Sequence, residues 1–425
     1  MNKSLIEQSF LIAKKEKRPA LLTYTVAGDN TKKKSLEILK SISNFADICE
    51  LGFPHNTPIA DGGQIQTSAY RAIKNGIKIN DIQSLKNDQV FDARHGVDPA
   101  GRFSEGTYPD INRTDPPRHA KMKAFLYKSF SPKAIQSWED DIRKIFVEHF
   151  DNIACDNSEQ SFDIVHHVCY PAPAAVICRM LGFSDNRRED FQRWSAALVE
   201  RLGTEISEEQ RNALIEMARF IRLKAEEKEK TPGKDLMTEI VFAEVDGERL
   251  SREEVVANGV FFLAAGHETT ANFLSNFIYQ ICTIPGLFES LQSDRTLLKS
   301  ALEESLRLES PVQNICRTVK DDTEIDANII LQDERMMFSL GAGNRDPDIF
   351  ESPEDFNLNR DNLNQHLAFG YGHHQCLGAR LARLEGEIFT NILLDRYNKI
   401  ELAGDFERQP GNVMRGYKSL NIKCS

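Results

Sequence analysis

The segment from Ser251 to Thr283 is predicted to form one long and largely apolar helix. Ser251 and Glu254 have the spacing of a capping box, which marks the start of a helix. A helix that is apolar on all sides is buried within its domain or in a membrane. Its longest unbroken apolar run, from Val260 to Ala265, is far shorter than the roughly twenty residues of a membrane span. We therefore expect this helix to run through the core of its domain, with no membrane span in the chain.

Further helices are predicted from the helical spacing of apolar residues elsewhere in the chain. These segments are residues 132–153, 189–202, 207–230, 294–309 and 379–394. Short β-like runs lie between residues 318 and 340. Residues 84–425 are therefore predicted to be mainly α, with small β-sheets.

Residues 1–83 have a different pattern, in which short strands alternate with helices. Strands are predicted over residues 20–27 and 46–51, and helices over residues 3–17, 31–44 and 64–75. Such alternation is typical of a parallel α/β layout. The charge also changes, because residues 1–83 hold 12 Lys+Arg and 8 Asp+Glu, whereas the remainder holds 41 and 56. We predict a domain boundary near residue 83.

The composition excludes several classes of protein. With 53 Lys+Arg, 64 Asp+Glu and a net charge of −11, the chain is not expected to bind nucleic acid. Its first residues carry scattered charges and lack the apolar core of a secretory signal. The eight cysteines are therefore expected to be reduced thiols or metal ligands in the cytoplasm, not a disulfide framework.

The sequence FGYGHHQCLG, at residues 369–378, places a cysteine in a glycine-rich loop just before a predicted helix. Glycines allow the backbone to approach a large flat ligand closely. The N-terminus of a helix stabilises a thiolate, and a thiolate ligand makes iron electron-rich, which favours cleavage of an O–O bond. Taken alone, however, Cys376 is more simply explained as a buried free cysteine on a glycine turn.

The centre of the long helix reads AGHETT at residues 265–270. An acid next to a hydroxyl is costly inside an apolar helix unless it is paired or functional. The hydroxyl of Thr269 can bond the carbonyl four residues earlier and bend the helix, which would open a groove for dioxygen and water. The alternative is a core threonine whose hydroxyl is simply satisfied.

A carboxylate and a guanidinium lie three residues apart in ESLR, at residues 304–307, and so share one helical face. Most such pairs are exposed ion pairs that add little stability. Arg360 is a candidate third member, which would complete a network with Glu304 and Arg307.

Together, in this order and spacing, these motifs resemble those of the cytochrome P-450 superfamily, the haem-thiolate mono-oxygenases, and most of all its soluble bacterial members. The cysteine loop matches FGxGxHxCxG at every fixed position, AGHETT matches A-G-x-[D/E]-T-T, and EESLRLESP matches the E-x-x-R helix and its proline. The resemblance extends from about residue 84 to the C-terminus. It implies the P-450 fold, a helical bundle around haem.

The resemblance implies a role for each matching residue. Cys376 would ligate the haem iron, and Glu268 and Thr269 would be the acid–alcohol pair that delivers protons during oxygen activation. Glu304, Arg307 and Arg360 would form a structural network. The cofactor-binding candidates are His119, Lys123, Ala265, Arg317, Phe369, Gly370, His374 and Gly378.

Four of these candidates concern the haem propionates. His119, Arg317 and His374 match the family's propionate partners. Lys123 stands where the family usually has arginine, four residues after His119. Lysine keeps the charge but loses the bidentate fork of arginine.

By the same resemblance, the chain is expected to insert one oxygen atom from O2 into a small hydrophobic substrate, with haem b as cofactor. Electrons would come indirectly from NAD(P)H, through a ferredoxin- or flavodoxin-type donor and its reductase, which would dock by charge near Cys376. The substrate pocket would be lined by residues 91–113, 165–215 and 310–320.

The N-terminal region departs from that family, because its usual first helix and two strands are not recognisable. Instead, three short segments between residues 21 and 66, LLTYTVAGD, ELGFP and PIADGGQIQ, resemble the tryptophan synthase α chain, a (β/α)8 barrel lyase. Glu50 would match its acid/base carboxylate, and Asp61 the carboxylate that contacts the indole nitrogen. Barrel active sites draw on loops from all eight strands, so Glu50 and Asp61 are expected to be vestigial in a partial β/α fragment.

Two alternatives to the mono-oxygenase remain open at this point. A lyase acting on indole-3-glycerol phosphate would need the absent barrel strands. A non-catalytic haem binder, or a catalytically dead fusion remnant, would not need Glu268 and Thr269. Product formation driven by NAD(P)H, release of indole, or haem binding with neither would distinguish the three.

Overall fold

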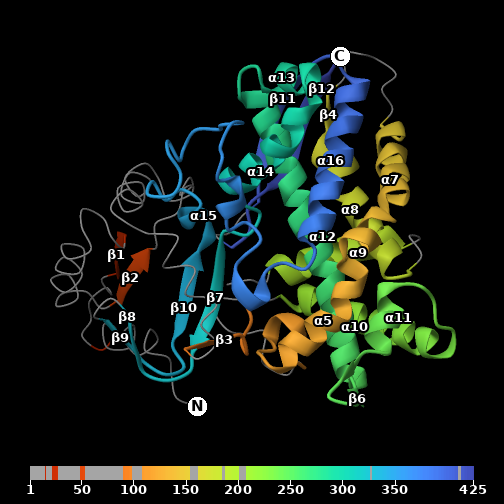
Figure 1. The fold of residues 1–425 in the computed structure, drawn as a ribbon, viewed down its shortest axis with the longest axis vertical. Helices are drawn as coiled ribbons and strands as arrows, with labels where there is room; N and C mark the ends of the chain where they lie inside the picture. Colours follow the sequence, from red (N-terminus) through yellow and green to blue (C-terminus); the bar gives the residue numbers. More distant parts are fainter. Residues whose placement is uncertain are drawn as a thin grey trace. The chain divides into compact units, whose positions relative to one another are not determined.

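The computed structural model describes residues 15, 22–26, 48–52, 90–97, 108–153, 161–183, 187–200, 207–325, 328–409 and 413–425. The chain divides into two compact units. One comprises residues 1–82 and 341–355, and the other comprises residues 83–340 and 356–425. The second unit holds most of the described helices (Figure 1).

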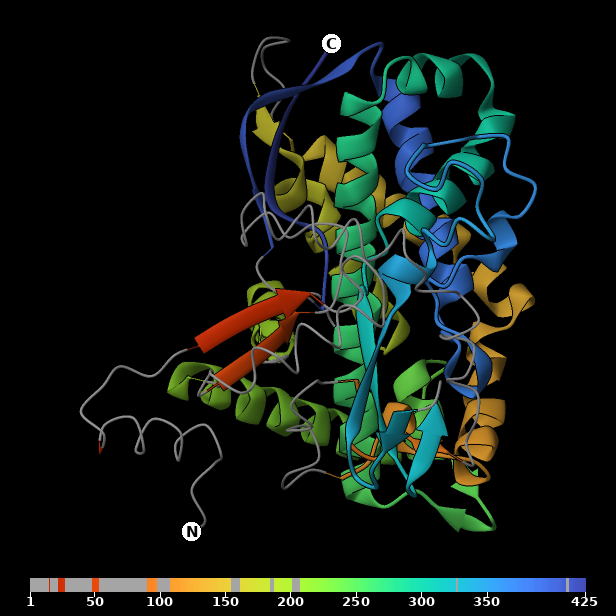
Figure 2. The same ribbon diagram turned by 90° about the vertical axis from the view of Figure 1, so that its left-hand side faces the viewer.

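The described helices of the larger unit surround one long central helix, α12 (Arg252–Thr283) (Figures 1 and 2). Helices α8, α9, α10, α14 and α16 all pack against α12. The other helices are α5 (Arg118–Phe130), α6 (Pro132–Gln136), α7 (Glu139–Asp151), α8 (Pro171–Met180), α9 (Arg188–Glu200), α10 (Glu208–Lys230), α11 (Leu236–Val241), α13 (Leu287–Ser293), α14 (Leu298–Leu308) and α16 (Ala379–Arg396). A short helix, α15 (Leu340–Gly343), follows the last strand of the β7 sheet.

Helix α12 begins where the capping box predicts. The side chain of Ser251 accepts from the backbone N–H of Glu254, and the Glu254 side chain accepts from the backbone N–H of Ser251. Buried residues occur on every side of the helix, among them Leu263, Leu274 and Ile278. The long apolar segment is therefore the core of the larger unit, as the sequence predicts.

The described strands of the larger unit form small antiparallel sheets. Strand β7 lies between β10 and β3, β12 lies between β11 and β4, and two hairpins pair β5 with β6 and β8 with β9. Their bounds are β3 (Phe91–Asp92), β4 (Phe162–Asp163), β5 (Glu244–Val245), β6 (Glu248–Arg249), β7 (Asn314–Val319), β8 (Thr323–Ile325), β9 (Asn328–Ile330), β10 (Arg335–Ser339), β11 (Ile400–Arg408) and β12 (Tyr417–Cys424). The prediction of a mainly α fold with small β-sheets is confirmed.

The smaller unit contains two described strands, β1 (Leu22–Val26) and β2 (Ile48–Gly52). They pair in parallel over their whole length, from Leu22 opposite Ile48 to Val26 opposite Gly52. Both strands fall where the sequence predicts them. The helices predicted over residues 3–17, 31–44 and 64–75 lie outside the described residues, apart from Lys15.

Two predicted helices are wrong in detail. The helix predicted over residues 132–153 is broken between α6 and α7, because the backbone N–H and the hydroxyl of Ser137 both bond the carbonyl of Ala134 and close the first helix. The helix predicted over residues 294–309 begins with a 3-10 turn, in which the Asp294 side chain caps the N–H of Thr296. Local hydrogen bonds of Ser and Asp compete with helix continuation in both places.

Candidate active site

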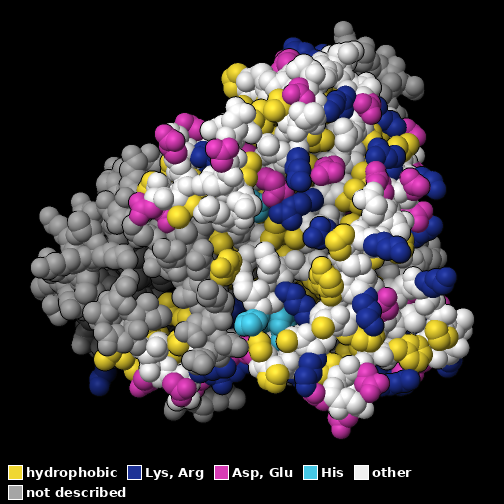
Figure 3. Space-filling model, in the orientation of Figure 1, with side chains coloured by type: hydrophobic (Ala, Val, Ile, Leu, Met, Phe, Trp, Pro, Cys, Tyr) yellow, Lys and Arg dark blue, Asp and Glu magenta, His cyan; other side chains and the backbone are white. Residues whose placement is uncertain are grey.

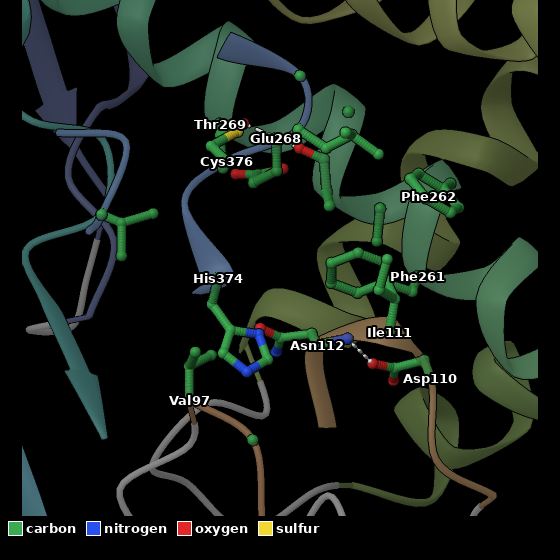
Figure 4. A pocket seen from close by; sticks show the side chains of 18 of the residues that line it. Val97, Asp110, Ile111, Asn112, Phe261, Phe262, Glu268, Thr269, His374 and Cys376 are labelled. Carbon is green, nitrogen blue, oxygen red and sulfur yellow. Dashed lines mark hydrogen bonds between the residues drawn. The ribbon is translucent and has the colours of Figure 1, made fainter. Parts of the chain in front are cut away.

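The larger unit encloses a cavity of about 710 Å³, lined mostly by apolar side chains (Figure 4). Helix α12 supplies Phe261, Ala265 and Thr269 to its wall, and the loop before α16 supplies Phe369 and Cys376. Further lining residues come from the three regions predicted for a substrate pocket. They include Val97, Ile111, Leu198, Leu214, Val312 and Ile315.

The cysteine loop is shaped by its glycines and by one backbone bond. Gly370 and Gly372 have φ angles of 70° and 76°, which belong to the left-handed region that glycine adopts without strain. The N–H of Cys376 donates to the carbonyl of Phe369 at 2.9 Å and closes the loop. Cys376 is thereby held just before α16, with its sulfur facing the cavity (Figure 4).

The surroundings of the Cys376 thiol act on its charge in opposite directions. Burial raises the pKa of the thiol, although the sulfur is open to the cavity. Against this act the backbone N–H groups of Gly378 and Ala379 and the charges of Lys123 and Arg383. Donors at a helix N-terminus together with two cations are the setting that favours a thiolate ligand.

A cluster of nitrogen-bearing side chains lines the cavity beside the cysteine loop. The rings of His119 and His374 lie 4.2 Å apart, and Arg317 is 4 % exposed. Among the described residues, His119 Nδ1 and His374 Nε2 have no hydrogen-bond partner. Asp115 lies 3.7 Å from His374 Nε2, which is too long for a hydrogen bond.

Burial affects both histidines strongly. It lowers the pKa of His119 to about 3, aided by the charges of His374 and Lys123, and it also lowers the pKa of His374. Neutral imidazoles with unsatisfied nitrogens at the wall of an apolar cavity are suited to hydrogen-bond the acidic edge of a flat apolar group. The thiol, the apolar walls and this polar cluster therefore fit haem.

Lys123 lines the same cavity as His119 and His374, and its proposed contact with a propionate stays a prediction. Its ammonium group donates to the carbonyl oxygens of His373 at 2.6 Å and Gln375 at 2.9 Å. Lys123 thus fastens α5 to the cysteine loop on both sides of His374. A compact ammonium can bond separate carbonyls in this way, since its donors are not fixed in a planar fork.

The centre of α12 contains the predicted acid and alcohol. The Thr269 hydroxyl donates to the carbonyl of Ala265 at 2.8 Å, and both residues line the cavity. Gly266 lies so close to α8 that an added Cβ would come within 2.8 Å of Ile177. A larger residue at position 266 would force the Ile177 side chain to move, so the close packing of the two helices favours glycine one turn before Thr269.

Comparison with known proteins identifies the family. Residues 190–414, more than half of the chain, match the family model of cytochrome P-450. This chain belongs to the cytochrome P-450 family. It is 34 % identical to cytochrome P-450 107B1 of Saccharopolyspora erythraea over 76 % of this chain and 78 % of that protein. It is 32 % identical to a steroid C26-monooxygenase of Mycobacterium tuberculosis, over 85 % of this chain and 94 % of that protein.

Solved P-450 structures have the same fold. The crystal structure of CYP109E1 from Bacillus megaterium in complex with testosterone is 33 % identical and superposes with a TM-score of 0.71, covering 81 % of this chain and 91 % of that one. The structure of CYP109Q5 from Chondromyces apiculatus is 31 % identical and superposes with a TM-score of 0.73, covering 82 % of this chain and 88 % of that one. The protein is therefore a haem-dependent P-450 mono-oxygenase that uses haem b and receives electrons from NAD(P)H through redox partners.

The Glu–Arg–Arg network of this P-450 is fully buried. The Glu304 carboxylate accepts from Arg307 Nε at 2.7 Å and Nη2 at 2.8 Å, and from Arg360 Nε at 2.9 Å. It also accepts the backbone N–H of Asn357 at 2.9 Å. The side chains of Glu304 and Arg307 are 0 % exposed, so the network fastens α14 to the segment that leads to the cysteine loop.

Sequence reasoning missed two partners of Glu268. The Tyr170 hydroxyl donates to Glu268 Oε2, and Gln409 Nε2 donates to Glu268 Oε1 at 2.6 Å. Glu268 itself is 2 % exposed. Tyr170 follows a π-helical turn, Val165–Cys169, a feature that is frequent at functional sites. Both partners are far from Glu268 in sequence, and no motif marks them.

The remaining predictions from the sequence concern membrane-spanning helices and the N-terminal region. None of the described helices is long and apolar enough to cross a membrane.

Residues 10–92 match the family model of the tryptophan synthase alpha chain, and lyase activity has no support beyond this match. Glu50 lies in β2, while Asp61 lies outside the described residues. The boundary near residue 83 stays a prediction.

Proposed function

We propose that Cys376 is the haem ligand of this mono-oxygenase and that hydrophobic substrates bind in the cavity next to it. One observation carries this proposal. The same apolar cavity is lined by Cys376, by Thr269 and by His119 and His374. Haem bound by Cys376 would supply the chemistry that activates dioxygen.

The protein's own residues would hold haem at two chemically different parts, the iron and the propionates. Cys376 would bind the iron, with Ala265 and Phe369 as apolar neighbours at the cavity wall. His119 and His374, with Arg317 beside them, would take the propionates, because their free nitrogens need an acceptor or a donor. Gly370 and Gly378 keep the loop free of side chains near the ring.

Protons would be managed on the α12 side of the cavity. The Thr269 hydroxyl, held by the carbonyl of Ala265, can accept a hydrogen bond from water while it donates to the helix. The Glu268 carboxylate lies next to it in the helix and would pass protons toward that hydroxyl. Water that enters the cavity beside Thr269 would connect the two groups.

The substrate would be a largely apolar molecule. Leu198, Leu214, Val260, Phe261 and Ile315 line the cavity, and apolar walls select apolar ligands. The relatives support this class, since one is named a steroid mono-oxygenase and one structure holds testosterone. Such molecules offer C–H bonds for insertion of an oxygen atom.

The electron donor would be a ferredoxin- or flavodoxin-type protein with an acidic face, working with its reductase in the cytoplasm. Figure 3 shows Lys and Arg side chains on the face that includes α5 and α16. Lys121 and Lys128 on α5, Lys133 on α6 and Arg380 on α16 are exposed. The described cysteines Cys169, Cys178, Cys282, Cys316, Cys376 and Cys424 are free, as a reducing compartment requires.

The test is the absorption spectrum of the reduced protein with and without carbon monoxide. The wild-type protein and a Cys282→Ser control should show the strongly red-shifted Soret band of thiolate-ligated haem. Cys376→Ser should lose this band, because a neutral hydroxyl cannot replace the thiolate. A wild-type spectrum without the shift, or an unchanged Cys376→Ser spectrum, would overturn the proposal.

A further inference from the structure

A second carboxylate, Glu303 on α14, connects two residues around the cysteine loop. Arg383 on α16 donates to it through Nε at 2.5 Å and Nη2 at 2.8 Å. His366 Nε2 lies 2.9 Å from Glu303 Oε2. The Glu303 side chain is 13 % exposed, so these contacts are largely shielded from water.

Both partners of Glu303, His366 and Arg383, contact residues at the start of the cysteine loop. His366 Nδ1 accepts the backbone N–H of Ala368 at 3.2 Å, so His366 Nε2 carries the hydrogen and donates to Glu303. The Arg383 guanidinium lies over the Phe369 ring, 4.4 Å from its centroid. The carbonyl of Phe369 in turn accepts the N–H of Cys376 at 2.9 Å.

The charge of Arg383 also acts directly on the Cys376 thiol. Arg383 is one of two cations that favour the thiolate form of Cys376. Glu303 pairs with Arg383 by two hydrogen bonds and offsets part of that positive charge. The ion pair therefore joins a positive charge that acts on the thiol to a negative charge, and each can be removed by a single substitution.

We propose that Glu303 and Arg383 are positioning residues that set the reduction potential of the iron bound by Cys376. This inference rests on the proposed role of Cys376 as the haem ligand. Reduction adds one electron to the iron and thiolate, so the guanidinium of Arg383 stabilises the reduced form. The carboxylate of Glu303 opposes that effect and keeps the reduced form less favoured.

The substitutions should therefore shift the potential in opposite directions. Arg383→Gln leaves the Glu303 charge unpaired and lowers the potential. Glu303→Gln leaves the Arg383 charge unpaired and raises it. A change of one nearby charge should alter the ratio of reduced to oxidised protein by about tenfold at fixed applied potential, which is about 59 mV for a one-electron couple. The double variant should return close to the wild-type value, because both charges are removed.

The experiment is a potentiometric titration of the haem-loaded protein, with dithionite as the source of electrons and the visible spectrum as readout. Arg396→Gln is the matched control. Arg396 also lies on α16, donates to Asp151 at 2.6 Å and stacks on Phe150 at 5.6 Å. Its substitution should leave the potential unchanged.

Several outcomes would overturn the inference. Shifts of the same sign in Arg383→Gln and Glu303→Gln, or no shift in either, would show a merely structural role. If Arg383→Gln loses thiolate ligation, Arg383→Lys and Glu303→Gln decide the question, because the first keeps the charge and the second keeps the side-chain volume. Loss of the carbon monoxide band in the wild-type protein would instead refute the role of Cys376 itself.

Discussion

The two sides of the cavity hold their carboxylates in different ways. On the side of the cysteine loop, Glu303 and Glu304 are bound by the guanidinium groups of Arg383, Arg307 and Arg360. On the α12 side, Glu268 is bound by a hydroxyl and an amide, from Tyr170 and Gln409.

This difference matches the role proposed for each side. A guanidinium does not release its proton, so the ion pairs of α14 keep their charges and fix the loop in place. A hydroxyl such as that of Tyr170 can donate and accept at once, so in the proposed function Glu268 would stay connected to groups that move protons. In the proposed function, the side that would supply electrons is fixed, and the side that would supply protons is held by exchangeable donors.

The largest expected effect comes from breaking the buried network of α14. Arg307→Ala should destabilise the protein by about 3–5 kcal/mol, because it leaves the Glu304 charge buried with too few partners. Urea denaturation followed by circular dichroism measures this. The exposed pair of Arg295 and Asp395 gives the control, and Arg295→Ala should cost less than about 1 kcal/mol. Equal effects of the two substitutions would contradict this view of the network.

Acid is expected to lower the free energy of unfolding, because it protonates the Glu303 carboxylate beside the cysteine loop. Burial alone would raise the pKa of this carboxyl, but hydrogen bonds from Arg383 and His366 outweigh burial and lower the pKa to about 2. The stabilisation is present above the ordinary pKa of 4.5 and is lost as the pH falls toward 2. It amounts to about 3 kcal/mol.

Unfolding free energies at pH 7 and pH 3 would check this, with Glu303→Gln as the comparison. The wild-type protein should lose more stability between the two pH values than Glu303→Gln does. Equal losses would show that Glu303 does not titrate in this range.

The sequence predicted the fold well, and it singled out Cys376 and Thr269, which line one cavity, because both results depend on local patterns. The capping box at Ser251 marks the start of α12, and glycines mark the loop around Cys376. The contacts of Glu268 could not be predicted in this way. Tyr170 is placed by a π-helical turn, and it meets Glu268 only after packing of α12 against that turn. Helical periodicity does not report such a turn, and no spacing rule links residues so far apart.

On the α12 side, Thr269→Val should reduce the ratio of oxygenated product to peroxide by about 10²-fold, since it removes the hydroxyl that is proposed to handle protons. The ratio is measured with a redox partner system and NAD(P)H. Thr283→Val is the control, because its hydroxyl makes the same bond to a carbonyl four residues earlier, at 2.7 Å, but lies at the exposed end of α12. A similar fall in both variants would mean that the bond to the helix, and not the position in the cavity, is what matters.

The smallest effect is expected for Tyr170→Phe, which removes a hydrogen-bond donor to Glu268. A hydrogen bond to a charged group contributes about 1.5 kcal/mol or more, so product formation should fall by about tenfold. The carbon monoxide spectrum and the potential should stay unchanged, because Tyr170 bonds Glu268 and His267 on α12. Tyr279→Phe, elsewhere on α12, controls for the loss of a hydroxyl. If Tyr170→Phe shifts the potential as the Glu303 variants do, the two sides of the cavity are electrically coupled and the contrast between them fails.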